Sequence, residues 1–133
     1  MKILFIACYS PLINNSASIE TLQYLNNLAK IDGNEVHLLT VNFPKNSIYY
    51  DEYILSMLDK KVKMHIISGG KIFEKIMPKK SLNTEVADVS KSNKSFIKTL
   101  LKKGKSIIAV PDMYLNWAKS ASKYGIELAK REK

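Results

Sequence analysis

The segment KILFIAC at residues 2–8 indicates the fold of this chain, because it is short, almost entirely apolar and followed by turn formers. Such a strand is typical of a parallel sheet that helices cover on both faces. A polar loop at residues 9–15 comes next, then a helical pattern at residues 16–31 and a second apolar run at residues 35–41. This order predicts an α/β fold, a Rossmann-like parallel sheet flanked by helices.

Apolar spacing predicts the elements in the rest of the chain. Ser16 is the predicted N-cap of the first helix, Ile19 belongs to its predicted buried face, and Gly33 is predicted to end it in a left-handed conformation. Pro78 and the polar residues after it predict an irregular segment at residues 71–92. The other predicted elements are helices at residues 50–60, 93–103 and 113–131 and strands at residues 62–67 and 106–110.

The composition is that of an ordinary globular protein, with 46% hydrophobic and 25% charged residues. No apolar run approaches the roughly 20 residues that span a bilayer, and the first strand lacks the features of a signal peptide. The one cysteine, Cys8, ends an apolar strand, which predicts a buried thiol rather than an activated nucleophile. These features predict a cytoplasmic protein, peripheral to the inner face of the membrane if its lysines bind anionic lipid.

The net charge of +9 is unevenly distributed along the chain. Residues 45–110 carry fourteen lysines and six acidic residues, a net +8, whereas residues 1–44 carry −1 and residues 111–133 carry +2. Arg131 is the single arginine, although arginine is favoured wherever phosphates or bases are recognised by paired hydrogen bonds. The composition therefore argues against nucleic acid as a partner. The lysine excess indicates either diffuse attraction to an anionic surface or a general compositional bias.

Ligands of open parallel sheets bind beyond the carboxyl ends of the strands, which here are the predicted loops at residues 9–16, 42–47 and 68–71. The first of these loops precedes a helix N-terminus, whose free N–H groups attract anions. The glycine-rich motif of dinucleotide binders and the P-loop are both absent from the sequence. His37 and His65 are predicted to lie inside strands and to face a helix or solvent. No carboxylate pair or His/Cys cluster in the sequence predicts a metal site.

Both ends of the chain resemble family 4 (group 1) glycosyltransferases, which are retaining enzymes of the GT-B architecture. The match at the amino terminus consists of KILFI at residues 2–6, YSP at residues 9–11 and, after the helix, GNEVHLLT at residues 33–40. Residues 111–133 are similar to the segment that precedes the fourth main strand of that family, and residues 45–105 are largely unmatched.

The resemblance implies a two-domain enzyme whose amino-terminal half binds the acceptor and whose carboxyl-terminal half binds a nucleotide-sugar donor. Residues 1–133 then form one partial domain, without the donor-binding domain and inactive by themselves, because the family's active-site histidine and donor-binding residues match nothing here. The implied acceptor is a glycan or a lipid-linked glycan, and no cofactor is implied. The family's Gly-Gly pair near the donor diphosphate corresponds to Asn14 and Asn15, and the histidine of its Gly-His-Glu-Val turn corresponds to Asn34.

The resemblance also implies which residues line the cleft between the two domains. Asp112 and Trp117 fit two roles each, since a helix cap and a core aromatic are also consistent with their positions. The residues implied to bind substrate are Tyr9, Ser10, Asn14, Asn15, Ser16, Asp112 and Trp117, and none is implied to be catalytic.

The usual strand order 3-2-1-4 of such domains places the first strand beside a fourth strand, for which the chain ends too early. We therefore expect an unpaired apolar edge along the first strand. This edge is expected to be covered by the last helix or a loop, or to pair with another copy of the chain in a homodimer.

A basic membrane-surface module without catalysis is an alternative of a different class. The predicted helix at residues 93–103 has an apolar side and a lysine side, which suits an anionic lipid surface. The same pattern fits an ordinary surface helix that packs its apolar side on the sheet. The predicted membrane-facing residues are Lys94, Lys98 and Lys102.

Overall fold

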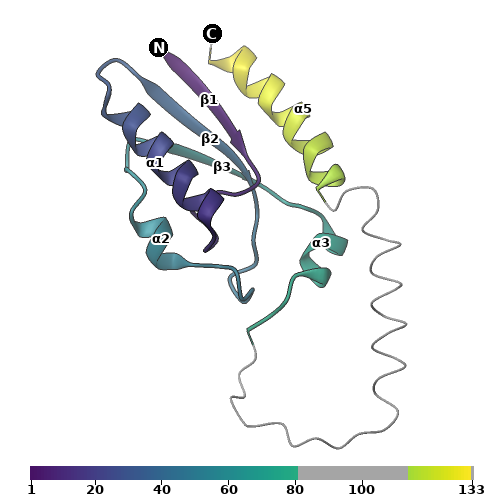
Figure 1. The fold of residues 1–133 in the computed structure, drawn as a ribbon. Helices are drawn as coiled ribbons and strands as arrows, with labels where there is room; N and C mark the ends of the chain where they lie inside the picture. Colours follow the sequence, from purple (N-terminus) through teal and green to yellow (C-terminus); the bar gives the residue numbers. More distant parts are fainter. Residues whose placement is uncertain (81–113, 133) are drawn as a thin grey trace, which may run out of the picture.

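The computed structural model describes residues 1–80 and 114–132, which form a three-stranded parallel sheet flanked by helices (Figure 1). The strands are β1 (Lys2–Ala7), β2 (Glu35–Val41) and β3 (Lys63–Ile67), and β2 lies in the middle of the sheet. Each strand lies within one residue of its predicted bounds. The predicted α/β class and the strand order 3-2-1 are confirmed.

The helices of the described residues are α1 (Ser16–Lys30), α2 (Glu52–Ser56), α3 (Lys71–Ile76) and α5 (Leu115–Arg131). The predicted first and last helices are thus confirmed, and the helix predicted at residues 50–60 is shorter than expected. The elements predicted at residues 93–103 and 106–110 lie outside the described residues.

The prediction for the start of α1 is wrong by one residue. Asn15 is the N-cap, with an extended backbone at φ −154° and ψ 168°, and its side-chain Oδ1 accepts a hydrogen bond from the Ser18 N–H at 2.8 Å. Ser16 is already helical. Ile19 is 37% exposed, because the buried face is set by residues 18, 22, 25 and 29, which lie on one side of the helix. Gly33 has φ +80° after the helix, as predicted.

Residues 71–76 form the helix α3, which corrects the irregular segment predicted there. Gly70 is its N-cap with φ +92°, and Met77 is its C-cap. Pro78 therefore stands just past the helix, where a proline ends a helix without disrupting it. Gly69 is also required here, since a Cβ at this position would lie 2.6 Å from the Phe73 ring.

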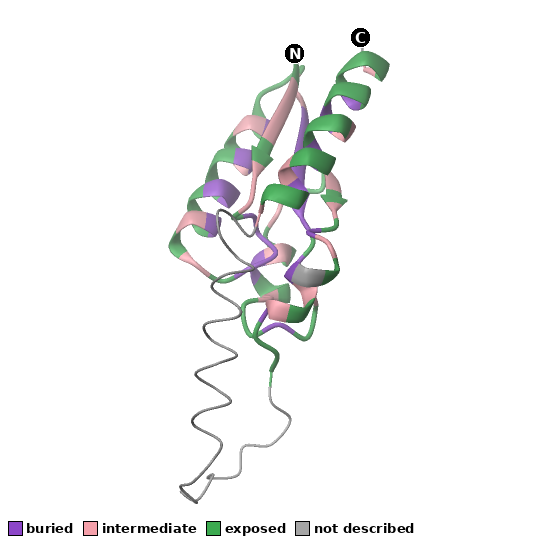
Figure 2. Cartoon of the chain, turned by 90° about the vertical axis from the view of Figure 1, so that its right-hand side faces the viewer, coloured by how far each residue is buried: buried purple, intermediate pink, exposed green. Residues whose placement is uncertain are grey.

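The two faces of the sheet pack on different helices. On one face Val36 and Leu38 of β2 form a buried cluster with Leu25 and Ala29 of α1. On the other face Leu39 belongs to the cluster that buries α5, in which the predicted stripe of Trp117, Ala121, Gly125 and Leu128 faces inward. Figure 2 shows the strands between α1 and α5, with the buried residues of each helix turned toward the sheet.

Within the described residues β1 pairs with β2 alone, so it is an edge strand of this sheet. Ile6 of β1 is 58% exposed, whereas Cys8 is half-buried against the core on the α5 side. Among the described helices none has the length and apolar character needed to cross a membrane.

Candidate functional site

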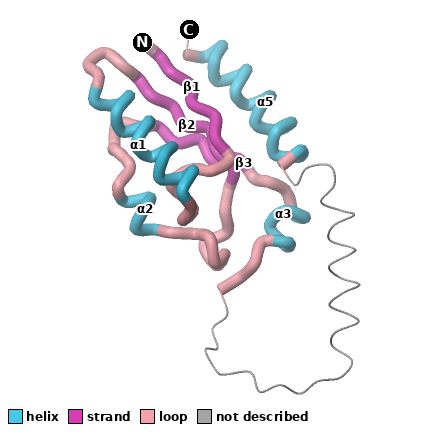
Figure 3. Tube along the Cα trace, in the orientation of Figure 1, coloured by secondary structure: helices cyan, strands magenta, loops and turns pink. Residues whose placement is uncertain are grey.

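Three loops meet at the carboxyl ends of the strands, on the side of the sheet away from the two termini (Figure 3). Backbone hydrogen bonds join them. The Asn14 N–H donates to the Tyr49 carbonyl at 2.9 Å, the Asp51 N–H to the Leu12 carbonyl at 3.1 Å, and the Ile48 N–H to the Pro78 carbonyl at 3.0 Å. These bonds hold the loops after β1 and β2 against each other and against the segment that follows α3.

These loops enclose a cavity of about 410 Å³. Its walls are mostly apolar and aromatic, and they include residues from the loops after β1 and β2, from the end of α3 and from the start of α5. The residues that define its character are Tyr9, Ile13, Asn15, Phe43, Tyr49 and Tyr114. A concave, aromatic-lined cavity at this edge of a parallel sheet is the usual form and place of a small-molecule site.

Aromatic rings connect the rim of the cavity to the core. The rings of Tyr9 and Tyr114 lie edge to face, with centroids 6.3 Å apart. The ring of Tyr114 also packs on the ring of Phe73, with centroids 5.6 Å apart. The rings of Phe73 and Phe43 have centroids 5.5 Å apart. Phe43 and Phe73 are buried, whereas Tyr9 is 47% and Tyr49 is 44% exposed. The cavity thus borders a buried aromatic cluster through Phe43, and its lining includes two tyrosines that are nearly half exposed.

Two of the residues expected to bind substrate, Tyr9 and Asn15, line this cavity. Ser10 does not, because its side chain is fully buried and its carbonyl accepts the N–H of Ile13 at 3.1 Å. Ser16 is exposed at the start of α1, and Trp117 is 5% exposed within the core, so the alternative core role of Trp117 is the observed one. The remaining predicted residues, Asp112, Lys94, Lys98 and Lys102, lie outside the described residues.

Asn14 and Asn15, which the sequence resemblance places at a Gly-Gly pair, are both engaged within the protein. Asn15 caps α1 through the Ser18 N–H, and the Asn14 Nδ2 donates to Asp51 Oδ2 at 3.1 Å. The first loop therefore supplies a helix cap and a loop-to-loop bond, and it sets a carboxylate next to Asn14. This chemistry does not favour a diphosphate at the N-terminus of α1.

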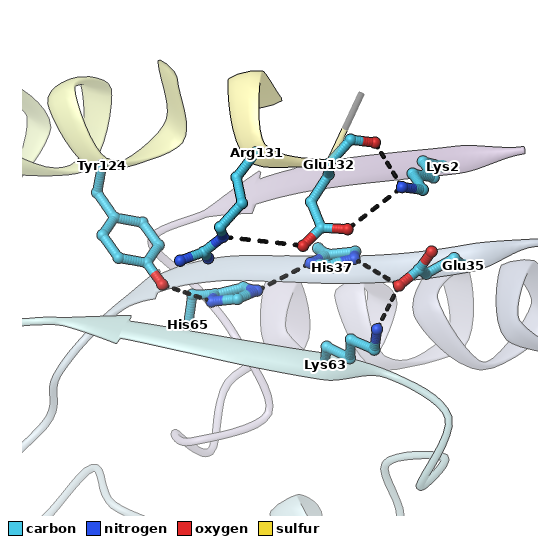
Figure 4. A network of polar contacts seen from close by, with 8 residues as sticks. All are labelled: Lys2, Glu35, His37, Lys63, His65, Tyr124, Arg131 and Glu132. Atoms are coloured by element: carbon cyan, nitrogen blue, oxygen red, sulfur yellow. Dashed lines mark hydrogen bonds and ion pairs between the residues drawn. The ribbon is translucent and has the colours of Figure 1, made fainter. Parts of the chain in front are cut away.

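A second polar cluster lies at the opposite end of the sheet, under the C-terminal half of α5 (Figure 4). His37 Nδ1 lies 2.9 Å from His65 Nε2, and His65 Nδ1 lies 2.8 Å from the Tyr124 hydroxyl. On the other side, His37 Nε2 lies 3.3 Å from Glu35 Oε1, which also pairs with Lys63. Both histidines thus face a helix, one of the two environments predicted for them.

The cluster shifts the pKa of three of its members. Hydrogen bonding and attraction from Lys63 lower the pKa of Glu35, and the same contacts raise the pKa of Lys63. The pKa of His65 is lowered, first by burial and then by electrostatic repulsion from its neighbours, chiefly His37 and Arg131. A neutral imidazole is therefore favoured at residue 65.

Sequence reasoning missed this cluster and part of the cavity. Glu35 and His37 stand two residues apart on a predicted strand, so their side chains lie on the same face of the sheet. This spacing was the one sign in the sequence that the two side chains are close together. Their partner Glu132 comes from the far end of the chain, and its position depends on how α5 packs. Phe43 lies in the loop predicted at residues 42–47 but was not chosen as a site residue, and Tyr49 lies just beyond that predicted loop.

Comparisons with protein-family models, with curated proteins and with solved structures find no match to this chain. Inferences about function therefore depend on the fold, on the cavity at the carboxyl ends of the strands and on the polar cluster at the opposite end of the sheet.

Proposed function

We propose that the cavity at the carboxyl ends of the strands binds a carbohydrate acceptor, and that the chain is the acceptor-side part of a retaining GT-B glycosyltransferase. The observation that carries this proposal is the aromatic-lined cavity of about 410 Å³ formed by loops that follow parallel strands. The resemblance of residues 2–6, 9–11 and 33–40 to family 4 glycosyltransferases supports the reaction class.

The lining of the cavity suits a sugar ring. A pyranose has a face of C–H groups that packs on an aromatic ring, and a polar edge of hydroxyl groups that needs hydrogen-bond partners. Tyr9 and Tyr49 combine both features, because each offers an aromatic face and a phenolic hydroxyl at the mouth of the cavity. Asn15 adds a side-chain amide to the cavity wall. Its Oδ1 caps α1, and its Nδ2 can donate a hydrogen bond to a sugar hydroxyl.

The cavity is also largely formed in advance. The loop bonds Asn14 to Tyr49 and Ile48 to Pro78 fix the positions of two walls, and Phe43 is buried at 3% exposure. A site whose walls are already ordered loses less conformational entropy when a ligand binds. This favours a binding role for the cavity over a purely structural gap.

Two lysines that flank the lining residues in the sequence fit an anionic acceptor. Ile76, Met77 and Pro78 line it, and they are flanked in sequence by Lys75 and Lys79. A lipid-linked glycan carries phosphate next to its sugar, so it satisfies both the aromatic walls and this basic margin. The donor binds to the other domain in this proposal, because the first loop of this chain uses both of its asparagines internally.

Equilibrium binding of a panel of disaccharides, including cellobiose, maltose and chitobiose, tests the proposal. At least one sugar should bind, and Tyr9→Ala and Tyr49→Ala should each weaken it by about fivefold, since one aromatic contact contributes about 1 kcal/mol. Tyr53→Ala is the matched control, because Tyr53 is 71% exposed on α2 and does not line the cavity. Nucleotide sugars should not bind to the chain alone.

Two results would contradict the proposal. The first is that no sugar of the panel binds; the second is that Tyr9→Ala and Tyr49→Ala bind as well as Tyr53→Ala. The membrane-surface alternative depends on Lys94, Lys98 and Lys102, which lie outside the described residues, and it stays a prediction. Vesicle co-sedimentation with anionic lipid and with all three lysines changed to Glu would test it.

A further inference from the structure

We propose that Glu35, His37 and Glu132 bind a zinc ion at the amino end of the sheet. One ligand atom from each residue lies within 4.8 Å of the others, and Figure 4 shows the three side chains converging between β2 and the end of α5. This site shares no residue with the cavity at the carboxyl ends of the strands. The inference therefore goes beyond the proposed function and does not depend on it.

His37 is the central ligand because it is buried with one nitrogen unsatisfied. It is 4% exposed, and no described residue forms a hydrogen bond with its Nε2. The Glu35 Oε1 lies 3.3 Å from Nε2, a long contact that satisfies this nitrogen only weakly. A buried polar atom without a partner is costly, and a bond from Nε2 to a cation removes that cost.

The spacing of these two atoms suits zinc. Two ligands of a tetrahedral zinc ion lie about 3.3 Å apart when each bond is about 2.0–2.1 Å long. The observed 3.3 Å between His37 Nε2 and Glu35 Oε1 agrees with that separation. Glu132 is 30% exposed at the end of α5, so its side chain has room to close the remaining gap. A fourth position stays open to water, as in zinc sites with three protein ligands.

The other side of His37 is held in the way that zinc-binding histidines are held. When His37 Nδ1–H donates to His65 Nε2, the lone pair of His37 Nε2 is directed toward the carboxylates. His65 Nδ1–H then donates to the Tyr124 hydroxyl, at 2.8 Å. This chain of contacts from β2 through β3 to α5 fixes the orientation of His37, and zinc binding selects the tautomer in which Nε2 carries the lone pair.

Lysines now neutralise the two carboxylates, and zinc must compete with them. Lys63 pairs with Glu35, and Lys2 Nζ lies 3.3 Å from Glu132 Oε2. Both lysine side chains are at least half exposed, at 58% and 50%, so they can turn into solvent. The C-terminus of α5 carries partial negative charge and favours a cation beside Glu132. Mixed imidazole and carboxylate ligands favour zinc over magnesium or calcium.

Calorimetric titration of the tag-free protein with zinc chloride tests the site. One zinc ion should bind per chain. Glu35→Gln, His37→Gln and Glu132→Gln should each weaken binding by at least about tenfold, as losing an oriented ligand does. Lys63→Gln should strengthen binding by about fivefold, because it removes a competing positive charge close to the site. Magnesium chloride should not bind.

Glu127→Gln and Cys8→Ser are the controls, because Glu127 is exposed on α5 and Cys8 is the single thiol; both should bind zinc like the wild type. Emission of the single tryptophan, Trp117, reports whether each variant is folded. If His37→Gln does not fold, the two glutamate variants carry the test. The inference is overturned if the wild type binds no zinc below about 100 μM. It is also overturned if Glu35→Gln and Glu132→Gln bind like the wild type, or if Lys63→Gln does not bind more tightly.

Discussion

Asn15 connects the first helix to the cavity, because its Oδ1 caps α1 while the residue lines the cavity wall. Asn15→Ala should lower the free energy of unfolding by about 1 kcal/mol, as expected when an N-cap is lost. Asn15→Ser should keep most of that stability, since a serine hydroxyl accepts the same hydrogen bond. Urea unfolding followed by Trp117 emission measures both changes.

The neighbouring asparagine provides the control for this experiment. Asn14 is exposed, and its side chain contacts Asp51 rather than a helix N–H. Asn14→Ala should therefore change the stability by less than about 0.5 kcal/mol. If Asn15→Ala and Asn15→Ser lower the free energy of unfolding by the same amount, the N-cap hydrogen bond is not the reason that Asn15 stabilises the protein.

His65 should make the stability depend on pH. Its pKa is lowered from 6.5 in the folded protein, so the unfolded chain binds the proton more tightly. The free energy of unfolding should therefore fall as the pH drops below about 6.5, down to the folded pKa. His65→Asn should show a shallower decrease over that range. Urea unfolding at several pH values, with a metal chelator present, measures the two slopes, and equal slopes would contradict this role.

Part of the cavity, but none of the Glu35, His37 and Glu132 cluster, could be predicted from single residues. Tyr9 and Asn15 were found because they follow a strand that the sequence marks clearly, and ligands bind at such positions. Tyr49 and Tyr114 come from segments whose sequence does not specify which side chains turn inward. Glu132 reaches Glu35 and His37 only through the packing of α5, which is a tertiary effect that no local pattern encodes.

At the level of elements, periodicity predicts the strands and the long helices and fails for the short ones. The short, largely apolar segments of β1, β2 and β3 are bounded by turn formers and are therefore predicted as strands. The six residues of α3 are too few for a helical period to be recognised, and Gly70 and Pro78, which bound it, also fit a loop. Ile19 was misplaced because the buried face of α1 is set by its contact with the sheet.

Close packing of α5 on the sheet gives a prediction at Gly125. A Cβ there would lie 3.4 Å from Leu39 Cδ2 and 3.7 Å from Leu4 Cδ2, which is ordinary contact. Gly125→Ala should therefore raise the free energy of unfolding by about 0.5–1 kcal/mol through helix propensity. Gly125→Leu should lower it by about 1–3 kcal/mol, because the added atoms do not fit between the helix and the sheet.

Ser122 is the matched control for the larger substitution, since it is exposed on the same helix. Ser122→Leu should change the stability by no more than about 0.5 kcal/mol. Thermal unfolding followed by circular dichroism compares the variants. If Gly125→Leu is as stable as Ser122→Leu, α5 does not pack on the sheet as closely as the structure indicates.

For the whole molecule, the free edge of β1 predicts an additional contact. Within the described residues only β2 pairs with β1, and Ile6 is 58% exposed beside that edge. An unpaired strand edge tends to acquire a partner, so we expect the β1 amides that do not bond to β2 to be protected from hydrogen exchange. Sedimentation velocity over a range of concentrations then shows whether a second copy provides the cover. A monomer whose β1 edge amides exchange as fast as those of an exposed loop would contradict the expectation.

For the whole molecule, we propose that a sugar binds in the cavity at the carboxyl ends of the strands. Amide chemical-shift mapping by NMR, with the disaccharide that binds most tightly, tests the location of that site directly. We predict that the shifted amides belong to the loops around Tyr9, Phe43 and Tyr49, and that Tyr49→Ala needs about five times more sugar to reach the same shifts. Shifts that gather instead around Glu35 and His37, or that are spread evenly over the protein, would contradict the claim.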